Sequence, residues 1–303
     1  MNIYHVCANP EQTSLQEFVV SWDRALEADM ERVAARVAAI ADLRFLGLTG
    51  PTCSGKTTAA KKLTEYLEAH GHRVHVISID DFYYDKAFLQ KRADDDPNIE
   101  IDYDSEDTID ISLLAEKTES LLACRQTRMP RFDFRTGQRV EGAVITPQSN
   151  DIFLLEGIQI LYPKVHQILS LAPYRSIYIC PLSAIQIGKE LFEPTELRLM
   201  RRLVRDSRYR ASDPAFTLYL WQSVRENEDK NIFPNAHLCH EVIDSTMPYE
   251  VGMLKPYLEE ILPSVPQDGP FWAQAQRILK SLEGLTDIPS VYMTENSLYK
   301  EFI

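Results

Sequence analysis

The chain has 303 residues, of which 45% are hydrophobic and 25% are charged, as in ordinary globular proteins, so bulk disorder is excluded. Its 45 acidic and 32 basic side chains give a net charge of −13, which argues against a nucleic-acid partner. No apolar run approaches the ~18–20 residues that span a bilayer, and the N-terminus lacks the pattern of a signal peptide. We therefore expect no membrane partner.

The chain contains five cysteines, which are scattered, odd in number and without a CxxC pair. This distribution argues against a disulfide framework or a zinc site and favours a reducing cytosol, so we expect a cytoplasmic protein. The sequence leaves the oligomeric state open, with a homo-oligomer among the options.

The predicted elements alternate between helix and strand along the chain. A long helix without Gly or Pro is predicted over residues 14–41, followed by an apolar strand at 44–49, a glycine-rich turn and a helix that ends at Gly71. The stretch from about 81 to 110 is rich in acids and predicts a loop, and the segment 128–142 is rich in turn residues. Further strands are predicted at 73–81, 151–157, 175–182 and 241–246, and further helices at 111–124, 195–210, 249–262 and 271–284. Near-continuous apolar strands between helices predict a doubly wound α/β fold, in which helices cover both faces of a parallel sheet.

The glycine-rich turn matches the phosphate-binding pattern G-x-x-x-x-G-K-[ST] and lies between a strand and a helix, where its mechanism requires it. Its glycines let successive N–H groups point inward, and the helix N-terminus adds positive charge. We expect Lys56 to bridge the β- and γ-phosphates of ATP and the Thr57 hydroxyl to bind Mg²⁺. Cys53 is interpreted as a neutral loop thiol. The predicted ATP-binding residues are Gly50, Pro51, Thr52, Cys53, Ser54, Gly55, Lys56, Thr57 and Thr58.

Two predicted strands end in acids on the sheet edge where open α/β sheets bind ligands. Glu156 ends the strand at 151–157 and is a candidate Mg²⁺ ligand, with a solvated strand-end acid as the alternative. Asp80, one strand away from the loop, is positioned to accept a proton from a hydroxyl that attacks the γ-phosphate. We choose Asp80 over Asp81, and helix capping by either remains the alternative. The N-K-x-D motif of GTPases is absent from the sequence.

The helix at 195–210 carries arginines at i, i+3, i+4 and i+7 opposite an apolar arc. We interpret them as one basic stripe on a mobile helix that clamps phosphate oxygens and excludes water. An exposed face paired with surface acids is the alternative. A nucleic-acid face is disfavoured, because no aromatic platform accompanies the stripe. The stripe comprises Arg198, Arg201, Arg202, Arg205 and Arg208.

Together, the segments GPTCSGKTT, ISIDDFY, MPRFDFRTGQR, FLLEGI, LRLMRRLVRDSRYR and SVRENEDKNIFPNA resemble the phosphoribulokinase/uridine kinase family. They are most similar to the uridine-kinase-like nucleoside kinase module found elsewhere fused to a TGS domain. The resemblance covers roughly residues 30–303. We expect a helical lead-in over 1–42. The resemblance implies a P-loop kinase domain over 43–265 with an arginine-bearing lid helix, and a C-terminal helix and tail packed on it over 266–303.

The resemblance also implies roles for single residues. Asp80, Lys56 and Arg205 would be catalytic, with Asp80 accepting the proton of a nucleoside 5′-hydroxyl, and Glu156 matches the Walker B-like acid. Asp104 aligns with the acid that grips the ribose. The remaining implied substrate contacts are Tyr83 and, in the lid motif R-x-x-R-D-x-x-x-R, Arg210.

The sequence departs from the family pattern where the base would bind. Uridine kinases place a histidine after a Tyr-Asp-Phe motif, whereas this chain has Phe132-Asp133-Phe134 and the matching position lies near Gly137. Phe132 is a candidate to stack on a base, with core packing as the alternative. Ala211 replaces a glycine at the end of the lid motif.

These observations predict an ATP-dependent nucleoside kinase that uses Mg²⁺ and transfers the γ-phosphate to a nucleoside 5′-hydroxyl. Two alternatives stay open. One is a kinase of the same fold that acts on a sugar phosphate, pantothenate or glycerate, although the acid-rich segment 94–110 disfavours a sugar phosphate. The other is a regulatory nucleotide-binding module without catalysis.

Overall fold

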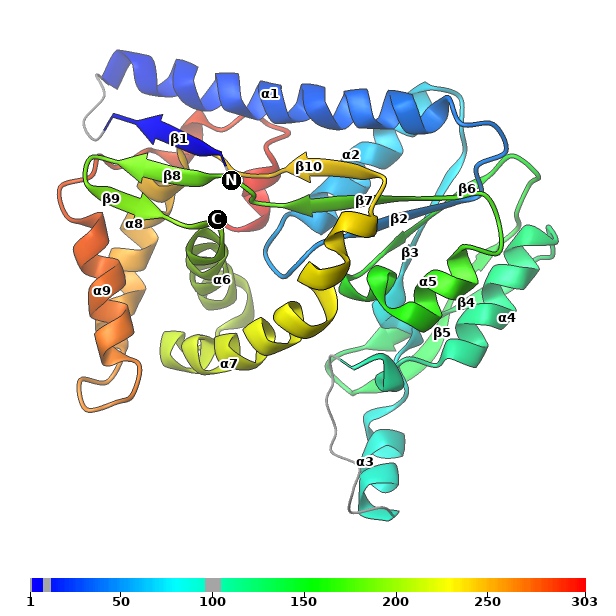
Figure 1. The fold of residues 1–303 in the computed structure, drawn as a ribbon. Helices are drawn as coiled ribbons and strands as arrows, with labels where there is room; N and C mark the ends of the chain where they lie inside the picture. Colours follow the sequence, from blue (N-terminus) through cyan, green and yellow to red (C-terminus); the bar gives the residue numbers. More distant parts are fainter. Residues whose placement is uncertain (1, 8–11, 96–104) are drawn as a thin grey trace.

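A five-stranded parallel sheet forms the centre of the molecule (Figure 1). The structure, a computed structural model, describes residues 2–7, 12–95 and 105–303. The sheet has the order β10-β7-β2-β6-β3, so the predicted α/β fold with a parallel sheet is confirmed. β6 lies between β2 and β3, and the chain crosses from one side of β2 to the other between β6 and β7. The strands are β2 (Phe45–Thr49), β3 (Val74–Ser78), β6 (Ile152–Glu156), β7 (Tyr174–Cys180) and β10 (Glu241–Asp244).

The two faces of the sheet bury alternate residues of the same strands. On β2, Leu46 and Leu48 pack into one apolar cluster with α1 and α2, whereas Phe45 packs into a second cluster with α4 and α5. This period of two explains why the strands are apolar throughout, since both of their faces are covered. The covering helices are α1 (Gln12–Ala38), α2 (Lys56–Ala69), α4 (Ile111–Leu122) and α5 (Pro163–Leu169).

Several elements were not expected from the sequence. The acidic stretch predicted as a loop contains α3 (Lys86–Asp95), and residues 96–104 lie outside the described part. The turn-rich segment is an antiparallel hairpin of β4 (Thr127–Asp133) and β5 (Gln138–Ile145). A small sheet of order β1-β8-β9 joins the N-terminus to the middle of the chain. Its strands are short and partly exposed, so they lack a clear apolar alternation. They are β1 (Ile3–Val6), β8 (Ala184–Ile187) and β9 (Glu190–Phe192).

The arginine-rich helix α6 (Pro194–Arg210) is buried from Leu197 to Val204, so the prediction of one basic stripe that clamps phosphate is wrong for Arg198 and Arg201. Arg198 forms a buried ion pair with Glu228, the first residue of the helical turn that continues α7 (Pro214–Asn227). Arg201 pairs with Glu250 at the start of α8 (Glu250–Ile261), with an N–O distance of 2.6 Å. A charge can be buried in this way only when a partner compensates it.

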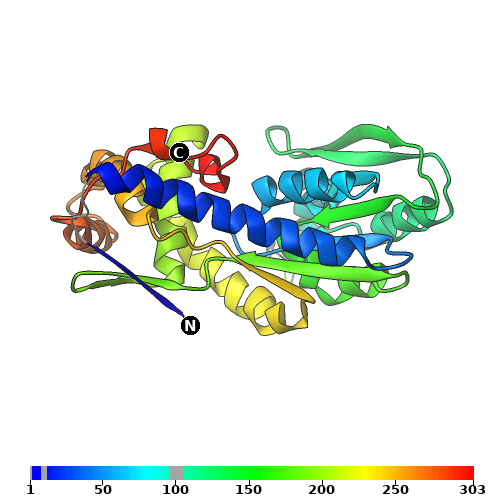
Figure 2. The ribbon, with the colours of Figure 1, turned by 90° about the horizontal axis from the view of Figure 1, so that it is seen from above.

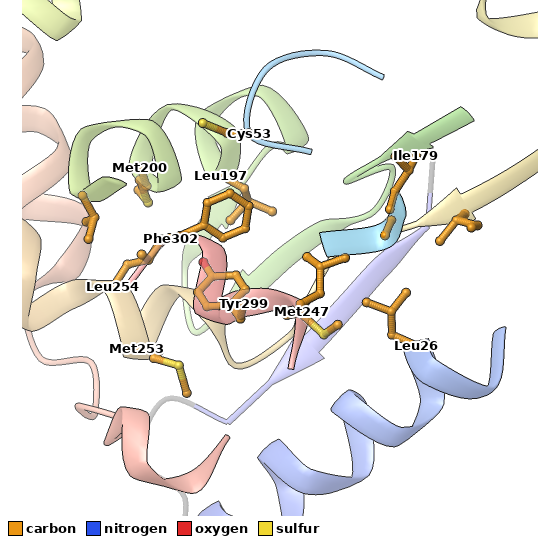
Figure 3. Packing of buried hydrophobic residues seen from close by; sticks show 14 of the residues in the cluster. Leu26, Cys53, Ile179, Leu197, Met200, Met247, Met253, Leu254, Tyr299 and Phe302 are labelled. Atoms are coloured by element: carbon orange, nitrogen blue, oxygen red, sulfur yellow. The ribbon is translucent and has the colours of Figure 1, made fainter. Parts of the chain in front are cut away.

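The C-terminal part returns to the centre of the molecule. After α8 and α9 (Trp272–Leu282), the tail over 283–303 passes between α1 and α6, where Tyr299 and Phe302 are fully buried (Figure 3). The long helix α1 extends across most of the molecule (Figure 2). Among the described residues, no helix combines the length and apolar character of a bilayer span.

Glu250→Gln should lower the free energy of unfolding by about 3–5 kcal/mol, because it leaves the Arg201 guanidinium buried without a counter-charge. The control is Glu259→Gln on the same helix. Glu259 is 45% exposed and lies 3.6 Å from Lys255, so its loss should change stability by less than about 1 kcal/mol. Urea unfolding monitored by circular dichroism measures both, and equal effects would contradict the prediction.

Candidate active site

The loop between β2 and α2 has the backbone shape that a phosphate cradle needs. Cys53 and Gly55 both have left-handed backbone angles, with φ of 57° and 95°. At Gly50 a side chain is excluded, since a Cβ atom would lie 2.0 Å from the carbonyl oxygen of Ile179. These conformations curl the loop around the N-terminus of α2, where N–H groups have no intrahelical partners and attract anions.

Two buried arginines hold this loop from behind. Arg198 Nη1 donates to the carbonyl of Thr52 at 3.3 Å, and Arg201 Nη1 donates to the carbonyl of Cys53 at 3.2 Å. These contacts fix the backbone of the loop at two successive residues. The arginines predicted to touch phosphate therefore support the loop instead.

The loop opens into a cavity of about 1020 Å³ at the carboxyl ends of β2, β3 and β6. This is where open α/β sheets bind ligands, next to the strand at which the chain changes sides. The cavity collects most of the predicted site residues and leaves out Gly50, Pro51, Thr58 and Phe132. Of the predicted residues, it is lined by Thr52, Cys53, Ser54, Gly55, Lys56, Thr57, Asp80, Tyr83, Glu156, Arg205 and Arg210.

Lys56 lies at the floor of the cavity and curls back over the loop. Its Nζ donates to the carbonyls of Gly50 and Pro51 at 2.8 and 2.9 Å. Burial lowers the pKa of this ammonium, although the nearby Glu156 acts in the opposite direction. Among the described residues, the hydrogen bonds of this ammonium go to neutral carbonyls. A desolvated ammonium of this kind is well suited to bind phosphate oxygens, which supply the missing negative charge.

Asp80 and Asp81 differ in what they contact. Asp81 accepts a hydrogen bond from the backbone N–H of Phe132 at 2.9 Å and thereby attaches the β4-β5 hairpin. Asp80 lines the cavity, and its Oδ1 accepts from Gln159 Nε2 at 2.8 Å. The geometry therefore favours Asp80 as the group available to a ligand.

Gln159, which the sequence analysis did not identify, organises this part of the site. Its amide nitrogen also donates to the Tyr83 hydroxyl at 2.6 Å, so it bridges two predicted site residues. Gln159 is 1% exposed, and its Oε1 is buried without a hydrogen-bond partner among the described residues. Gln159 comes three residues after Glu156, just beyond the end of β6. This position at the sheet edge is a signal in the sequence from which it could have been identified as a site residue.

Glu156 lies opposite Lys56 and is held by the neighbouring strand. Ser78 and Glu156 are paired in register across β3 and β6, and Ser78 Oγ donates to Glu156 Oε1 at 2.9 Å. Burial raises the pKa of Glu156, and this effect outweighs the opposing influence of Ser78 and Lys56. An exposed hydroxyl on Thr57 lines the same cavity. Mg²⁺ bound to a nucleotide takes only one or two oxygen ligands from the protein. The Glu156 carboxylate and the Thr57 hydroxyl are oxygen ligands that could fill this role.

Positive charge gathers at the end of α6 that faces the cavity. Arg202, Arg205 and Arg210 all lie within ion-pair distance of the single buried carboxylate of Asp206, at 3.2, 2.8 and 3.5 Å. All three line the cavity. Desolvation and the charge of Arg205 lower the pKa of Arg210. One carboxylate cannot neutralise three guanidinium groups, so this wall of the cavity attracts an anion.

An aromatic cluster forms the wall near the hairpin. Phe132 is buried and packs edge-on against Tyr83, with ring centroids 5.6 Å apart. Phe134 is 61% exposed and is the phenylalanine of the described cavity lining. The candidate for stacking on a base thus moves from Phe132 to Phe134. Asp104, the predicted ribose ligand, lies outside the described residues.

One carboxylate enters the cavity from the far end of the chain. Glu301, in the C-terminal tail, lines the cavity and accepts hydrogen bonds from Thr58 on α2. More than 240 residues separate these two positions, and no motif marks Glu301, so the sequence offered no signal for it.

Glu156→Gln should raise the melting temperature at pH 8 in a buffer that contains EDTA. A carboxyl group whose pKa is higher in the folded chain binds more protons there, so its ionised form destabilises the fold as pH rises above the ordinary value of 4.5. The neutral amide avoids this cost and can still accept from Ser78. The gain should grow between pH 5 and pH 8 in thermal scans, and a lower melting temperature at pH 8 would contradict the prediction.

Comparisons with known proteins identify chains that are similar to this one. The uridine kinase of Clostridium perfringens strain SM101 is 29% identical over 163 residues, which are 54% of this chain and 67% of the relative. The uridine kinase of Bacillus thuringiensis is 27% identical over 201 residues, covering 65% of this chain and 84% of the relative. The solved structure of the YGR205w protein shares the fold, with a TM-score of 0.50, 16% identity, and coverage of 72% of this chain and 89% of that one. The family model described as "Phosphoribulokinase / Uridine kinase family" matches residues 45–251, more than half of the chain, and the protein therefore belongs to this family of P-loop kinases.

Proposed function

We propose that the protein is an ATP-dependent nucleoside kinase that transfers the γ-phosphate of ATP to a nucleoside 5′-hydroxyl. The observation that carries this proposal is the shared cavity, in which the phosphate loop with Lys56 and the carboxylate of Asp80 line one space. We propose that a triphosphate and an alcohol meet in this space and that the Asp80 carboxylate lies next to the alcohol.

The residues present fit a nucleoside triphosphate with its metal. The loop and the N-terminus of α2 supply N–H groups, and Lys56 supplies a desolvated charge. Thr57 and Glu156 would hold Mg²⁺, which when bound neutralises charge on the phosphate oxygens. These features support ATP as the phosphate donor.

The proposed reaction uses one base and a set of positive charges from the protein. The acceptor hydroxyl gives its proton to the Asp80 carboxylate while its own oxygen forms a bond to the γ-phosphorus. The bond from that phosphorus to the β,γ-bridging oxygen breaks, and ADP leaves. Arg205 and Arg210 line the cavity where charge spreads over the transferred group, so they are proposed to neutralise it.

A nucleoside is the acceptor class that the cavity supports best. Phe134 presents an exposed ring at the wall near Asp80, which suits a planar base. The relatives named uridine kinase support the same class. Because the pyrimidine-reading histidine is missing near Gly137, we do not assign a particular base.

Incubation with ATP, Mg²⁺ and a panel of purine and pyrimidine nucleosides should release ADP with at least one nucleoside. Asp80→Asn should bind ATP nearly as the wild type does but reduce kcat by about 10²-fold or more, because the amide cannot take the proton. A coupled ADP-release assay measures both, with pantothenate, glycerate and sugar phosphates in parallel. ADP release only with these other acceptors would refute a nucleoside substrate, and a normal kcat in Asp80→Asn would refute the base assignment.

Gln159→Leu should reduce kcat by about 10-fold or more while the KM for ATP stays within about twofold. The amide fixes Asp80 through a charge-assisted hydrogen bond, whose loss corresponds to ~1.5–3 kcal/mol, and it does not contact the phosphate loop. Steady-state kinetics on the variant, together with its melting temperature, test this positioning role. A proportional rise in the KM for ATP would indicate general damage to the cavity instead.

A further inference from the structure

The C-terminal tail places a carboxylate on the helix that follows the phosphate loop. Glu301 Oε2 accepts hydrogen bonds from the backbone N–H and the hydroxyl of Thr58, at 3.2 and 3.0 Å. Thr58 is the third residue of α2, and Glu301 lines the same cavity as Lys56 and Asp80. The contact therefore belongs to the nucleotide site itself, although it joins opposite ends of the kinase fold.

The position that Glu301 occupies is an anion position. The N–H groups of the first helical turn have no intrahelical acceptors and carry the positive end of the helix dipole. At a phosphate loop these groups are the ones that bind phosphate oxygens. The Glu301 carboxylate oxygen accepts hydrogen bonds from the N–H and the hydroxyl of Thr58. A phosphate oxygen, which is also an anionic acceptor, could take the same two hydrogen bonds.

Packing on both sides of Glu301 holds the carboxylate in place. Leu298 lies against Gly55, where an added Cβ atom would come within 2.5 Å of its methyl group. Tyr299 and Phe302 are fully buried (Figure 3). The Arg201 guanidinium lies 5.2 and 5.1 Å from their ring centroids. The backbone around Glu301 is thus part of the core, and only its side chain can be displaced cheaply.

A second anchor holds the tail a few residues before Glu301. Asp23 of α1 is 2% exposed and accepts hydrogen bonds from Thr294 N at 2.8 Å and from Ser297 Oγ at 2.8 Å. The Tyr249 hydroxyl donates to the same carboxylate. The helix α1 therefore fixes the segment that carries Glu301. Because this segment is attached, the Glu301 carboxylate has a high effective concentration at Thr58.

We propose that Glu301 is an internal competitor of the nucleotide, which ATP and ADP displace from Thr58 when their phosphate oxygens bind there. The inference rests on the proposed function, since it requires a nucleotide at this loop. Binding rotates the Glu301 side chain away while the buried tail stays in place. The cavity is also lined by Asp80 and Glu156, so the Glu301 carboxylate opposes a polyphosphate by charge as well as by position. Glu301 thus weakens nucleotide binding and favours release of ADP.

Isothermal titration calorimetry of the full chain with ADP and with Mg²⁺–ATP tests the proposal. Glu301→Gln keeps the shape but removes the charge, and Glu301→Ala removes the acceptor altogether. We expect Kd to tighten in both variants, by about 10-fold in Glu301→Ala and by less in Glu301→Gln, because a hydrogen bond to a charged group competes with the ligand. The matched control is Glu295→Gln, an exposed acid of the same tail that is absent from the described cavity lining, whose Kd should stay within twofold.

Circular dichroism melts show whether each variant is folded before titration. Tighter binding in the two Glu301 variants but not in the control supports the proposal. An unchanged or weaker Kd in both variants overturns it, and a weaker Kd would make Glu301 a supporting contact of the nucleotide. Failure of all four proteins to bind either nucleotide overturns the proposed function and the inference together, whereas equal binding overturns the inference alone.

Discussion

The buried guanidinium of Arg201 is the interaction on which the geometry of the site depends. It pairs with Glu250, donates to the Cys53 carbonyl of the phosphate loop, and lies against the rings of Tyr299 and Phe302. One charge thereby joins α6, α8, the loop and the tail. An unpaired charge in the core is costly, so arrangements of these four elements that separate Arg201 from Glu250 are strongly disfavoured.

The arginines of α6 illustrate how one sequence pattern divides into two tasks. Arg198 and Arg201 face the core and support the loop through its carbonyls, whereas Arg202, Arg205 and Arg210 surround Asp206 and face the cavity. A helix anchored by two buried ion pairs is a rigid wall over most of its length. The clamp predicted from the sequence therefore stays a prediction for the last turns alone, where the side chains become exposed.

The cavity is built from charges that are expensive to leave unpaired. Burial lowers the pKa of Lys56 and raises that of Glu156. In both residues, burial therefore disfavours the ionised form of the side chain in the absence of a ligand. A polyphosphate with its cation would satisfy both. Glu301 partly satisfies the N-terminus of α2 in the same way, which connects the stability of the free protein to its affinity for nucleotide.

Much of this molecule was determined locally by the sequence. The apolar runs predicted the parallel sheet, because strands covered on both faces have no polar side, and the spacing of Gly50, Gly55 and Lys56 predicted the loop. The acids at the strand ends, Asp80 and Glu156, were predicted to lie near the loop because parallel strands end at one sheet edge. Their roles remain predictions.

Tertiary structure decided what depends on contacts between distant segments. The periodicity of α6 could not tell which arginines would be buried, because that depended on Glu228 and Glu250 arriving from other helices. Likewise, Phe134 rather than Phe132 faces the cavity because the hairpin attaches through Asp81. The place of Glu301 beside Thr58 exists only because α1 and α6 bury the tail between them, and burial is a property of the whole packed chain rather than of any local pattern.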